Sequence, residues 1–115
     1  MKLILDYKKD ADLFDQTARS WAEKIERTKK SQIRNFYDKV LELEQRTKYE
    51  DDFDEILPFV KMLNSKVAYA VSRKVASREF EEMMHLCIEQ VKTKEDLKTF
   101  KLFFEAVLGF YKGRD

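Results

Sequence analysis

The chain has 115 residues, and its 23 basic and 22 acidic side chains leave a net charge of +1, which argues against a generally basic nucleic-acid-binding protein. This length suits one helical domain with one core, over residues 1–115, and excludes two. Two glycines and one proline leave few positions for tight turns, so we expect an all-α fold, a compact bundle of about five helices.

Two amphipathic helices are predicted in the first half of the chain. Asp10 is expected to cap a helix that runs to about Arg27. The apolar stripe of this helix consists of Leu13, Phe14, Ala18, Trp21, Ala22 and Ile25. Thr28 or Ser31 is expected to cap a second helix that ends near Arg46. The buried arc of this second helix consists of Ile33, Phe36, Tyr37, Val40, Leu41 and Leu43.

A third helical region is predicted over residues 53–75, where Pro58 marks a start or a kink. If the helix is continuous, Lys66 and Arg73 share a face with three apolar side chains, those of Phe59, Met62 and Tyr69. Two interpretations stay open. Either the helix breaks near Asn64 and Ser65, or the basic residues border an aromatic surface that a ligand completes.

Two further helices are predicted in the last third of the chain. Ser77 is expected to cap a helix that ends near Val91 and buries Phe80, Met83, Met84, Cys87, Ile88 and Val91. Thr93 and Asp96 have the spacing of a capping box, which opens a last helix that ends near Lys112. The apolar arc of the last helix consists of Leu97, Phe100, Phe103, Phe104, Val107, Leu108, Phe110 and Tyr111. Because this arc is so wide, the last helix is either the centre of the bundle or also serves a partner.

Few residues offer catalytic or metal-binding chemistry. Glu82 and His85 have the spacing of one ligand pair in di-iron bundles, but such sites need the motif twice and the chain has one histidine. His85 is therefore expected on the solvated surface. Cys87 lies on an apolar arc without a histidine beside it, so a buried structural cysteine is expected. We predict no metal, no cofactor and no enzymatic activity.

The sequence also indicates where in the cell the protein is expected. One cysteine cannot form an internal disulfide, and the apolar run within the first nine residues is too short for a signal peptide or a membrane span. We therefore expect a soluble, cytoplasmic protein without a membrane partner.

Charge is sorted along the chain. The segment from Pro58 to Arg78 contains no acidic residue, and its basic residues are Lys61, Lys66, Arg73, Lys74 and Arg78. Acidic blocks lie on both sides of it, at residues 50–55 and 79–82. Sorted charge lets a neutral protein present one face to a polyanion. The alternative is an ordinary solvated surface, on which these cations pair with neighbouring acids.

A second group of cations and amides lies at the start of the second predicted helix. It consists of Lys29, Lys30, Gln32 and Arg34. Backbone N–H groups at a helix start add partial positive charge, so phosphate contact is one interpretation. Pairing of Arg34 with Asp38, four residues later, is the other.

Three separated blocks resemble the small subunit of the type III-A, or Csm-type, CRISPR effector complex. The first runs from Thr28 to Tyr37 and contains the Thr/Ser-Gln-Ile/Leu-Arg pattern. The second contains Leu57-Pro58 and Met62-Leu63 and then the run from Lys66 to Arg73, similar to a Lys-Leu-Ala-Tyr-Ala…Arg pattern. The third is the aromatic-rich last helix, from Phe100 to Lys112.

This resemblance implies a compact helical subunit that stacks in several copies along a ribonucleoprotein filament. There it would line the channel for the guide–target duplex and contact target RNA, with crRNA and the other subunits of the complex as further partners. Cleavage in this family belongs to other subunits, so the chain would be non-enzymatic. The rival interpretation is a helical adaptor that binds only protein, through the aromatic face of the last helix.

The resemblance also implies a set of RNA-contacting residues. Gln32, Arg34, Lys66 and Arg73 are the matched polar positions, and we assign them to sugar-phosphate contact. Tyr69 is expected either to pack beneath them or to stack. The full predicted RNA-binding set is Lys29, Lys30, Gln32, Arg34, Lys66, Tyr69, Arg73, Lys74 and Arg78.

Overall fold

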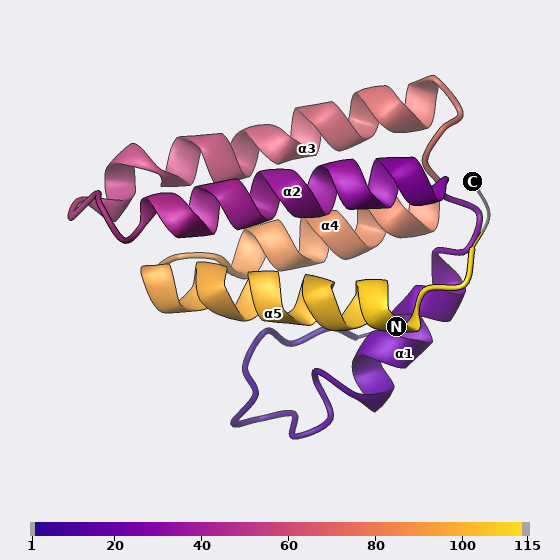
Figure 1. The fold of residues 1–115 in the computed structure, drawn as a ribbon, viewed down its shortest axis with the longest axis horizontal. Coiled ribbons are helices and arrows are strands. Elements are labelled where there is room, and N and C mark those ends of the chain that lie inside the picture. Colours follow the sequence, from indigo (N-terminus) through magenta and orange to yellow (C-terminus); the bar gives the residue numbers. More distant parts are fainter. Residues whose placement is uncertain (1, 114–115) are drawn as a thin grey trace.

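The chain folds into helices joined by short loops (Figure 1). The computed structural model describes residues 2–113. Its elements in chain order are α1 (Gln16–Lys24), α2 (Lys30–Arg46), the 3-10 helix η1 (Phe53–Glu55), α3 (Leu57–Ser72), α4 (Arg78–Gln90) and α5 (Lys94–Phe110). Within the described residues no strand occurs, and no helix is long and apolar enough to cross a membrane. The predicted all-α fold class is confirmed.

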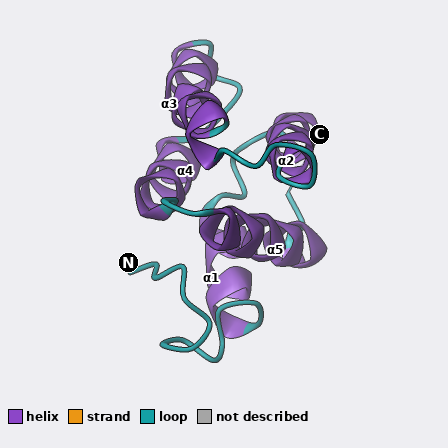
Figure 2. Cartoon of the chain, turned by 90° about the vertical axis from the view of Figure 1, so that its left-hand side faces the viewer, coloured by secondary structure: helices purple, strands orange, loops and turns teal. Residues whose placement is uncertain are grey.

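Helix α5 is the centre of the bundle. Seen end-on, it lies among α1, α2 and α4 (Figure 2), and it packs mainly against α1 and α2. Phe100, Phe103 and Phe104 are fully buried. The ring of Phe104 contacts Tyr37 of α2 and Phe80 of α4, at centroid distances of 5.6 and 6.2 Å. The central position is confirmed. A partner on the aromatic face of α5 stays a prediction and is not favoured, because the chain itself covers most of that face.

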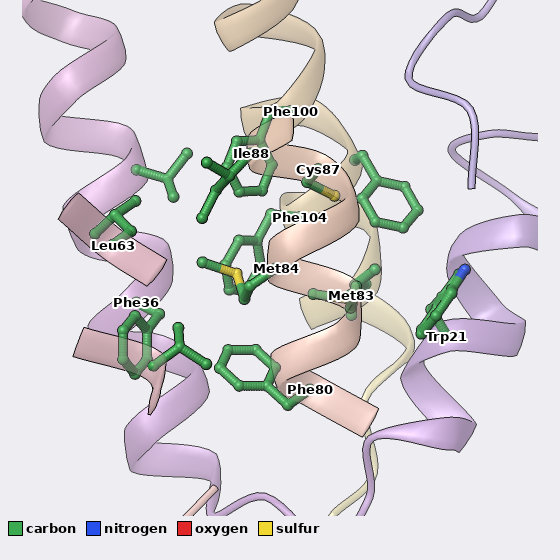
Figure 3. Packing of buried hydrophobic residues seen from close by; sticks show 14 of the residues in the cluster. Trp21, Phe36, Leu63, Phe80, Met83, Met84, Cys87, Ile88, Phe100 and Phe104 are labelled. Carbon is green, nitrogen blue, oxygen red and sulfur yellow. The ribbon is translucent and has the colours of Figure 1, made fainter. Parts of the chain in front are cut away.

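Helix α4 carries core side chains on two sides (Figure 3). Phe80 and Met84 point toward α2 and α3, and the Phe80 ring lies 5.5 Å from that of Phe36. Met83 lies on the side of Trp21, which belongs to α1. All the residues that the sequence predicted to be buried on this helix are buried. The chain therefore packs one continuous core around α4 and α5.

The first helix starts later than predicted. α1 begins at Gln16 and not after Asp10, and it ends at Lys24, three residues before the expected Arg27. The carboxylate of Asp10 accepts hydrogen bonds from the Asp12 N–H (3.0 Å) and the Thr17 hydroxyl (2.7 Å). These bonds hold a turn before the helix, so the aspartate is not free to cap it.

The segment before α1 is attached to the bundle by a side chain from α4. The amide of Gln90 accepts a hydrogen bond from the Leu5 N–H (2.9 Å) and donates one to the Leu3 carbonyl (2.8 Å). Leu3 and Leu5 are buried. Gln90 is more than 80 residues away from Leu3 and Leu5 in the sequence, so no local sequence pattern indicates this contact.

Helix α2 begins without a side-chain cap. Its cap position is Lys29, so the predicted caps Thr28 and Ser31 are both wrong. Thr28 is fully buried, and its hydroxyl is engaged by Ser77 at the start of α4. The predicted end of the helix at Arg46 is confirmed.

Helix α3 is continuous, so the predicted break near Asn64 and Ser65 is wrong. Pro58 lies in the first turn, where a missing backbone N–H leaves no intrahelical bond unmade. Leu57, the residue before the proline, is the first residue of the helix. The restriction that a proline places on the residue before it therefore interrupts no earlier helical turn. The proline marks a start and not a kink.

Helix α3 ends in a Schellman motif. The Val75 N–H donates to the Ala70 carbonyl at 3.1 Å, and the Lys74 N–H donates to the Val71 carbonyl at 2.9 Å. The motif requires a left-handed residue after the helix, and Lys74 takes this conformation with φ of 63°. Glycine usually occupies such a position, because a side chain there costs conformational energy.

The starts of α4 and α5 are as predicted. Ser77 accepts a hydrogen bond from the Phe80 N–H at 3.2 Å and caps α4. Thr93 and Asp96 form the reciprocal bonds of a capping box at the start of α5. The last helix ends at Phe110, two residues before the expected Lys112.

Candidate nucleic-acid interface

Helices α2 and α3 run antiparallel along one side of the bundle (Figure 1), and two contacts set their register. At one end, the guanidinium of Arg46 lies 5.3 Å from the centroid of the Phe59 ring. At the other end, the Lys29 N–H donates to the carbonyl of Val75 at 3.3 Å. The facing edges of the two helices are therefore aligned over their whole length.

From this register we infer that basic side chains of the two helices lie opposite one another. Seven residues are about two turns of a helix, so steps of seven stay on one face. One step from Arg46 and from Phe59 brings Lys39 opposite Lys66, and a second step brings Gln32 opposite Arg73. The resulting α2–α3 seam consists of Gln32, Lys39, Arg46, Phe59, Lys66 and Arg73. The seam contains four cations, and the exposed Glu42 lies beside it on α2, three residues after Lys39 and four before Arg46.

The flank of α3 that borders α2 carries apolar side chains that the bundle does not cover. Phe59 is 45% exposed, Met62 46% and Tyr69 63%. Lys66 and Arg73 lie on the same helical face and are exposed as well. We call this set the α3 stripe, and it consists of Phe59, Met62, Lys66, Tyr69 and Arg73. The structure therefore contains the aromatic surface bordered by basic residues, while the ligand that would complete it stays a prediction.

The cations of this surface lack acidic partners. Across residues 2–113, the ion pairs within 4.0 Å are Lys24–Glu82, His85–Glu89 and Lys101–Glu105. None of them includes a residue of the seam or of the predicted RNA-binding set. In the described part of the chain, these cations therefore form no ion pair with neighbouring acids within 4.0 Å, and the interpretation in which Arg34 pairs with Asp38 is wrong.

Further basic residues gather where α2 begins and α3 ends. Arg27, Lys74 and Arg78 lie around one surface depression, whose lining is Arg27, Val71, Lys74, Ala76, Ser77, Arg78 and Glu79. Lys29 lies beside it, because its N–H is bonded to the carbonyl of Val75. Lys30 is exposed at the first position of α2. The structure thus brings four of the predicted residues, Lys29, Lys30, Lys74 and Arg78, to one end of the seam.

A buried hydrogen-bond network holds this end together. The hydroxyl of Thr28 accepts a bond from the Ser77 N–H at 2.9 Å, and the two hydroxyls share a bond at 3.0 Å. The Ser77 hydroxyl in turn caps α4 through the Phe80 N–H. From the other side, the Tyr111 hydroxyl bonds to the carbonyl of Thr28. Thr28 therefore fixes the two loops that carry the basic residues relative to each other.

Arg34 lies away from the seam. It is three residues before Tyr37, so the two lie about 60° apart around α2, whereas Arg34 and Arg46 are about 120° apart. Tyr37 faces α5, where its hydroxyl lies 3.4 Å from the Glu105 carboxylate. Arg34 is exposed near that edge. Of the four matched polar positions, the structure groups Gln32, Lys66 and Arg73 and separates Arg34 from them.

The described residues offer little for catalysis. His85 is exposed and lies 2.9 Å from the Glu89 carboxylate, as a surface histidine would. Cys87 is buried, and burial raises the pKa of its thiol well above the usual value, which disfavours the nucleophilic thiolate. Burial, with a contribution from Glu105, also raises the pKa of Tyr37. Within residues 2–113 no three His, Cys, Asp or Glu side chains are placed to hold a metal ion.

The sequence reasoning missed three basic residues of this surface. Lys39 and Arg46 follow Gln32 at steps of seven, and this spacing was available as a signal. The spacing alone does not show that these residues lie beside α3, because that depends on the register of α2 against α3. Arg27 was expected to end the first helix, and the structure places it beside Lys74 and Arg78.

Comparison with protein-family models gives one match that spans all the helices. Residues 8–114 match the family described as Csm2 Type III-A. Searches of curated proteins and of solved structures find no match to the chain. The family match includes every residue of the seam and of the predicted RNA-binding set. The resemblance drawn from the three sequence blocks is confirmed.

Proposed function

This chain belongs to the Csm2 Type III-A family and is a small subunit of a type III-A CRISPR complex, and we propose that its α2–α3 seam holds target RNA by the sugar-phosphate backbone. Lys39, Arg46, Lys66 and Arg73 supply the positive charge, and Gln32 supplies an amide that bonds to sugar or phosphate oxygens. The basic residues at the start of α2 and the end of α3 extend the surface.

The observation that supports this proposal is that no cation of the seam forms an ion pair within 4.0 Å among the described residues. The register places four cations along the neighbouring edges of two helices, with Glu42 as the one acid beside them on α2, and the ion pairs of the described residues lie elsewhere. Four cations beside a single acid repel one another, so a bound polyanion would stabilise this arrangement. Phosphate contact of this kind carries no sequence information. Guide pairing would supply the specificity.

In the assembled complex, the chain would act without catalysis. Copies of it would stack along a ribonucleoprotein filament, with crRNA, target RNA and the other subunits as partners, in the cytoplasm. The seam would line the channel for the guide–target duplex. The rival protein-only adaptor is not favoured, because the aromatic face of α5 on which it rested is buried.

The test is the paired substitution of Lys66 and Arg73 by Ala in the assembled complex. Both side chains are exposed, so the helical content should stay unchanged by circular dichroism. RNA affinity should fall, and the slope of log affinity against log salt should become shallower by roughly 0.7 for each phosphate that is no longer bound. Filter binding over a salt series measures both.

Two exposed lysines outside the seam and outside the predicted RNA-binding set are the matched controls. Lys8 belongs to the segment before α1 and Lys98 to α5, and Ala at either position should leave affinity and salt slope unchanged. Equal losses of affinity from the control pair and the seam pair would mean that only the net charge matters. Unchanged affinity with both pairs would contradict the proposal and favour an adaptor that binds only protein.

A further inference from the structure

The ring of Tyr69 is the most exposed aromatic group on any of the helices, with 63% of the residue accessible. Its hydroxyl makes no hydrogen bond among the described residues, although a buried or structural tyrosine usually finds a partner. The guanidinium of Arg73 lies over the ring at 5.5 Å from the centroid. One face of the ring is therefore occupied by a cation, and the rest of it is open to solvent.

Phe59 and Met62 extend this apolar surface along the α3 stripe. Phe59 is ten residues before Tyr69, which corresponds to about 15 Å along a helix. Its ring, like that of Tyr69, is accompanied by a guanidinium, in this case that of Arg46 at 5.3 Å. Lys66 lies between the two rings on the same face. Aromatic rings and cations therefore alternate along one exposed helix.

This alternation matches the chemistry of unpaired nucleotides. Proteins hold single strands by stacking bases on aromatic rings while cations follow the phosphates. A continuous A-form duplex presents phosphates, 2′-hydroxyls and base edges, but it hides the faces of its bases. An exposed ring between cations can therefore stack a base that is splayed out of the strand, while the cations bind the phosphates on either side of it.

We propose that the α3 stripe holds an unpaired segment of the bound RNA, with at least one base stacked on Tyr69. Lys66 and Arg73 hold the flanking phosphates, and Phe59 provides a second apolar platform. The inference rests on the proposed RNA-binding function and adds to it the kind of RNA recognised. A second copy of the chain is a poor occupant, because face-to-face packing of two stripes would bring like charges together.

The experiment compares three RNA probes with the purified full chain. The probes are a single-stranded homopolymer, the same strand with abasic sites, and a blunt RNA duplex. The protein variants are Tyr69→Ala, which removes the ring, and Tyr69→Phe, which keeps it. Affinities are measured by fluorescence anisotropy over a salt series, and self-association is followed by analytical ultracentrifugation.

The stacking proposal predicts a specific pattern of affinities. Tyr69→Ala should weaken binding to the single strand by roughly 5- to 100-fold, because one base–aromatic stack is removed. The salt slope should stay unchanged, because every phosphate keeps its cation. Tyr69→Phe should bind as the unchanged chain does. The abasic strand should bind the unchanged chain weakly, and Tyr69→Ala should not weaken that binding further.

Other outcomes overturn the stacking proposal in distinguishable ways. If the abasic and normal strands bind equally and Tyr69→Ala has no effect, then no base stacks on Tyr69. The proposed function would survive this result if Lys66→Ala and Arg73→Ala still weakened binding. Absence of binding to any probe would overturn both proposals. Self-association that Tyr69→Ala abolishes, without RNA binding, would assign the stripe to contacts between copies of the chain.

Discussion

Helices α3 and α5 are both rich in aromatic and aliphatic side chains, but they use them in opposite ways. The aromatic residues Phe100, Phe103 and Phe104 of α5 are fully buried at the centre of the bundle. Phe59 and Tyr69 of α3 are largely exposed on its outer side. The difference comes from position, because α5 has neighbours on several sides while α3 packs mainly on α4 (Figure 2). A helix rich in apolar residues therefore indicates a binding surface only when it lies at the edge of the bundle, where other helices leave part of it exposed.

The strongest test of this contrast pairs two phenylalanines, one from each helix. Phe104→Ala should destabilise the fold by about 3–5 kcal/mol, because it opens a cavity in the core. Phe59→Ala should cost less than about 1 kcal/mol, because nearly half of that residue is already exposed. Urea denaturation followed by circular dichroism measures both. Equal destabilisation by the two changes would show that the α3 stripe is part of the core and not a free surface.

A second test concerns the network that places the basic end of the seam. Thr28→Val keeps the shape of the side chain but leaves the Ser77 N–H without its acceptor, so the fold should be destabilised by about 1–3 kcal/mol. RNA affinity should fall as well under conditions where the protein stays folded, because the two basic loops are no longer fixed.

Thr28→Ser is the matched control, because it keeps the hydroxyl and should keep most of the stability and the affinity. Denaturation and anisotropy measurements on the same samples separate the two effects. An unchanged RNA affinity in folded Thr28→Val protein would mean that the network supports only the fold.

The same contrast explains how much of the structure is readable from the sequence. The caps of α4 and α5 were predicted because each depends on residues at most four positions apart, such as Thr93 and Asp96. The start of α1 was not, because the Asp10 carboxylate is used by Asp12 and Thr17 in a turn. Nor was the attachment of the first residues to Gln90, which joins distant parts of the chain.

The residues of the candidate site also differ in whether local sequence or tertiary packing groups them. Lys66, Tyr69 and Arg73 lie on one helix, so their common face follows from helical periodicity alone. Lys39 and Arg46 join them only through the alignment of α2 with α3, which depends on tertiary packing. Arg34 was grouped with Gln32 because the two are close in sequence. On a helix, residues two positions apart point in different directions, and Arg34 lies toward α5.

Lys74 offers a third test, since its position favours glycine for the fold and a cation for the proposed function. Lys74→Gly should stabilise the protein by about 1 kcal/mol, because the left-handed conformation no longer strains a side chain. The same change should weaken RNA binding and make its salt dependence shallower. Opposite changes in stability and affinity, measured on one variant, would identify a residue placed for binding.

The control for Lys74 is Ala at the same position. Lys74→Ala removes the charge and keeps the strained conformation, so it should weaken binding equally without the gain in stability. Unchanged affinity in both variants would remove Lys74 from the proposed interface, while the contribution of the other seam residues would stand.

The smallest expected effect concerns the buried thiol of Cys87 and the pH dependence of folding. Burial raises the pKa of this thiol above its ordinary value of 9.0, so the folded chain keeps the proton where the unfolded chain releases it. Because the unfolded state then binds fewer protons, stability that is present below pH 9 is lost as the pH rises. The loss attributable to Cys87 should be about 1 kcal/mol between pH 9 and pH 10.

Cys87→Ala isolates this contribution, because it removes the titrating group and keeps every other one. The variant should be less stable than the unchanged chain at pH 7, where it lacks the packing of the sulfur, and the difference should shrink toward pH 10. Tyr37, whose pKa is also raised from 10.0, titrates mainly above that window and is common to both proteins. A constant difference in unfolding free energy from pH 7 to pH 10 would mean that the thiol is accessible in the folded chain. The core around α4, against which α3 packs, would then be less tightly closed than the burial of Cys87 indicates.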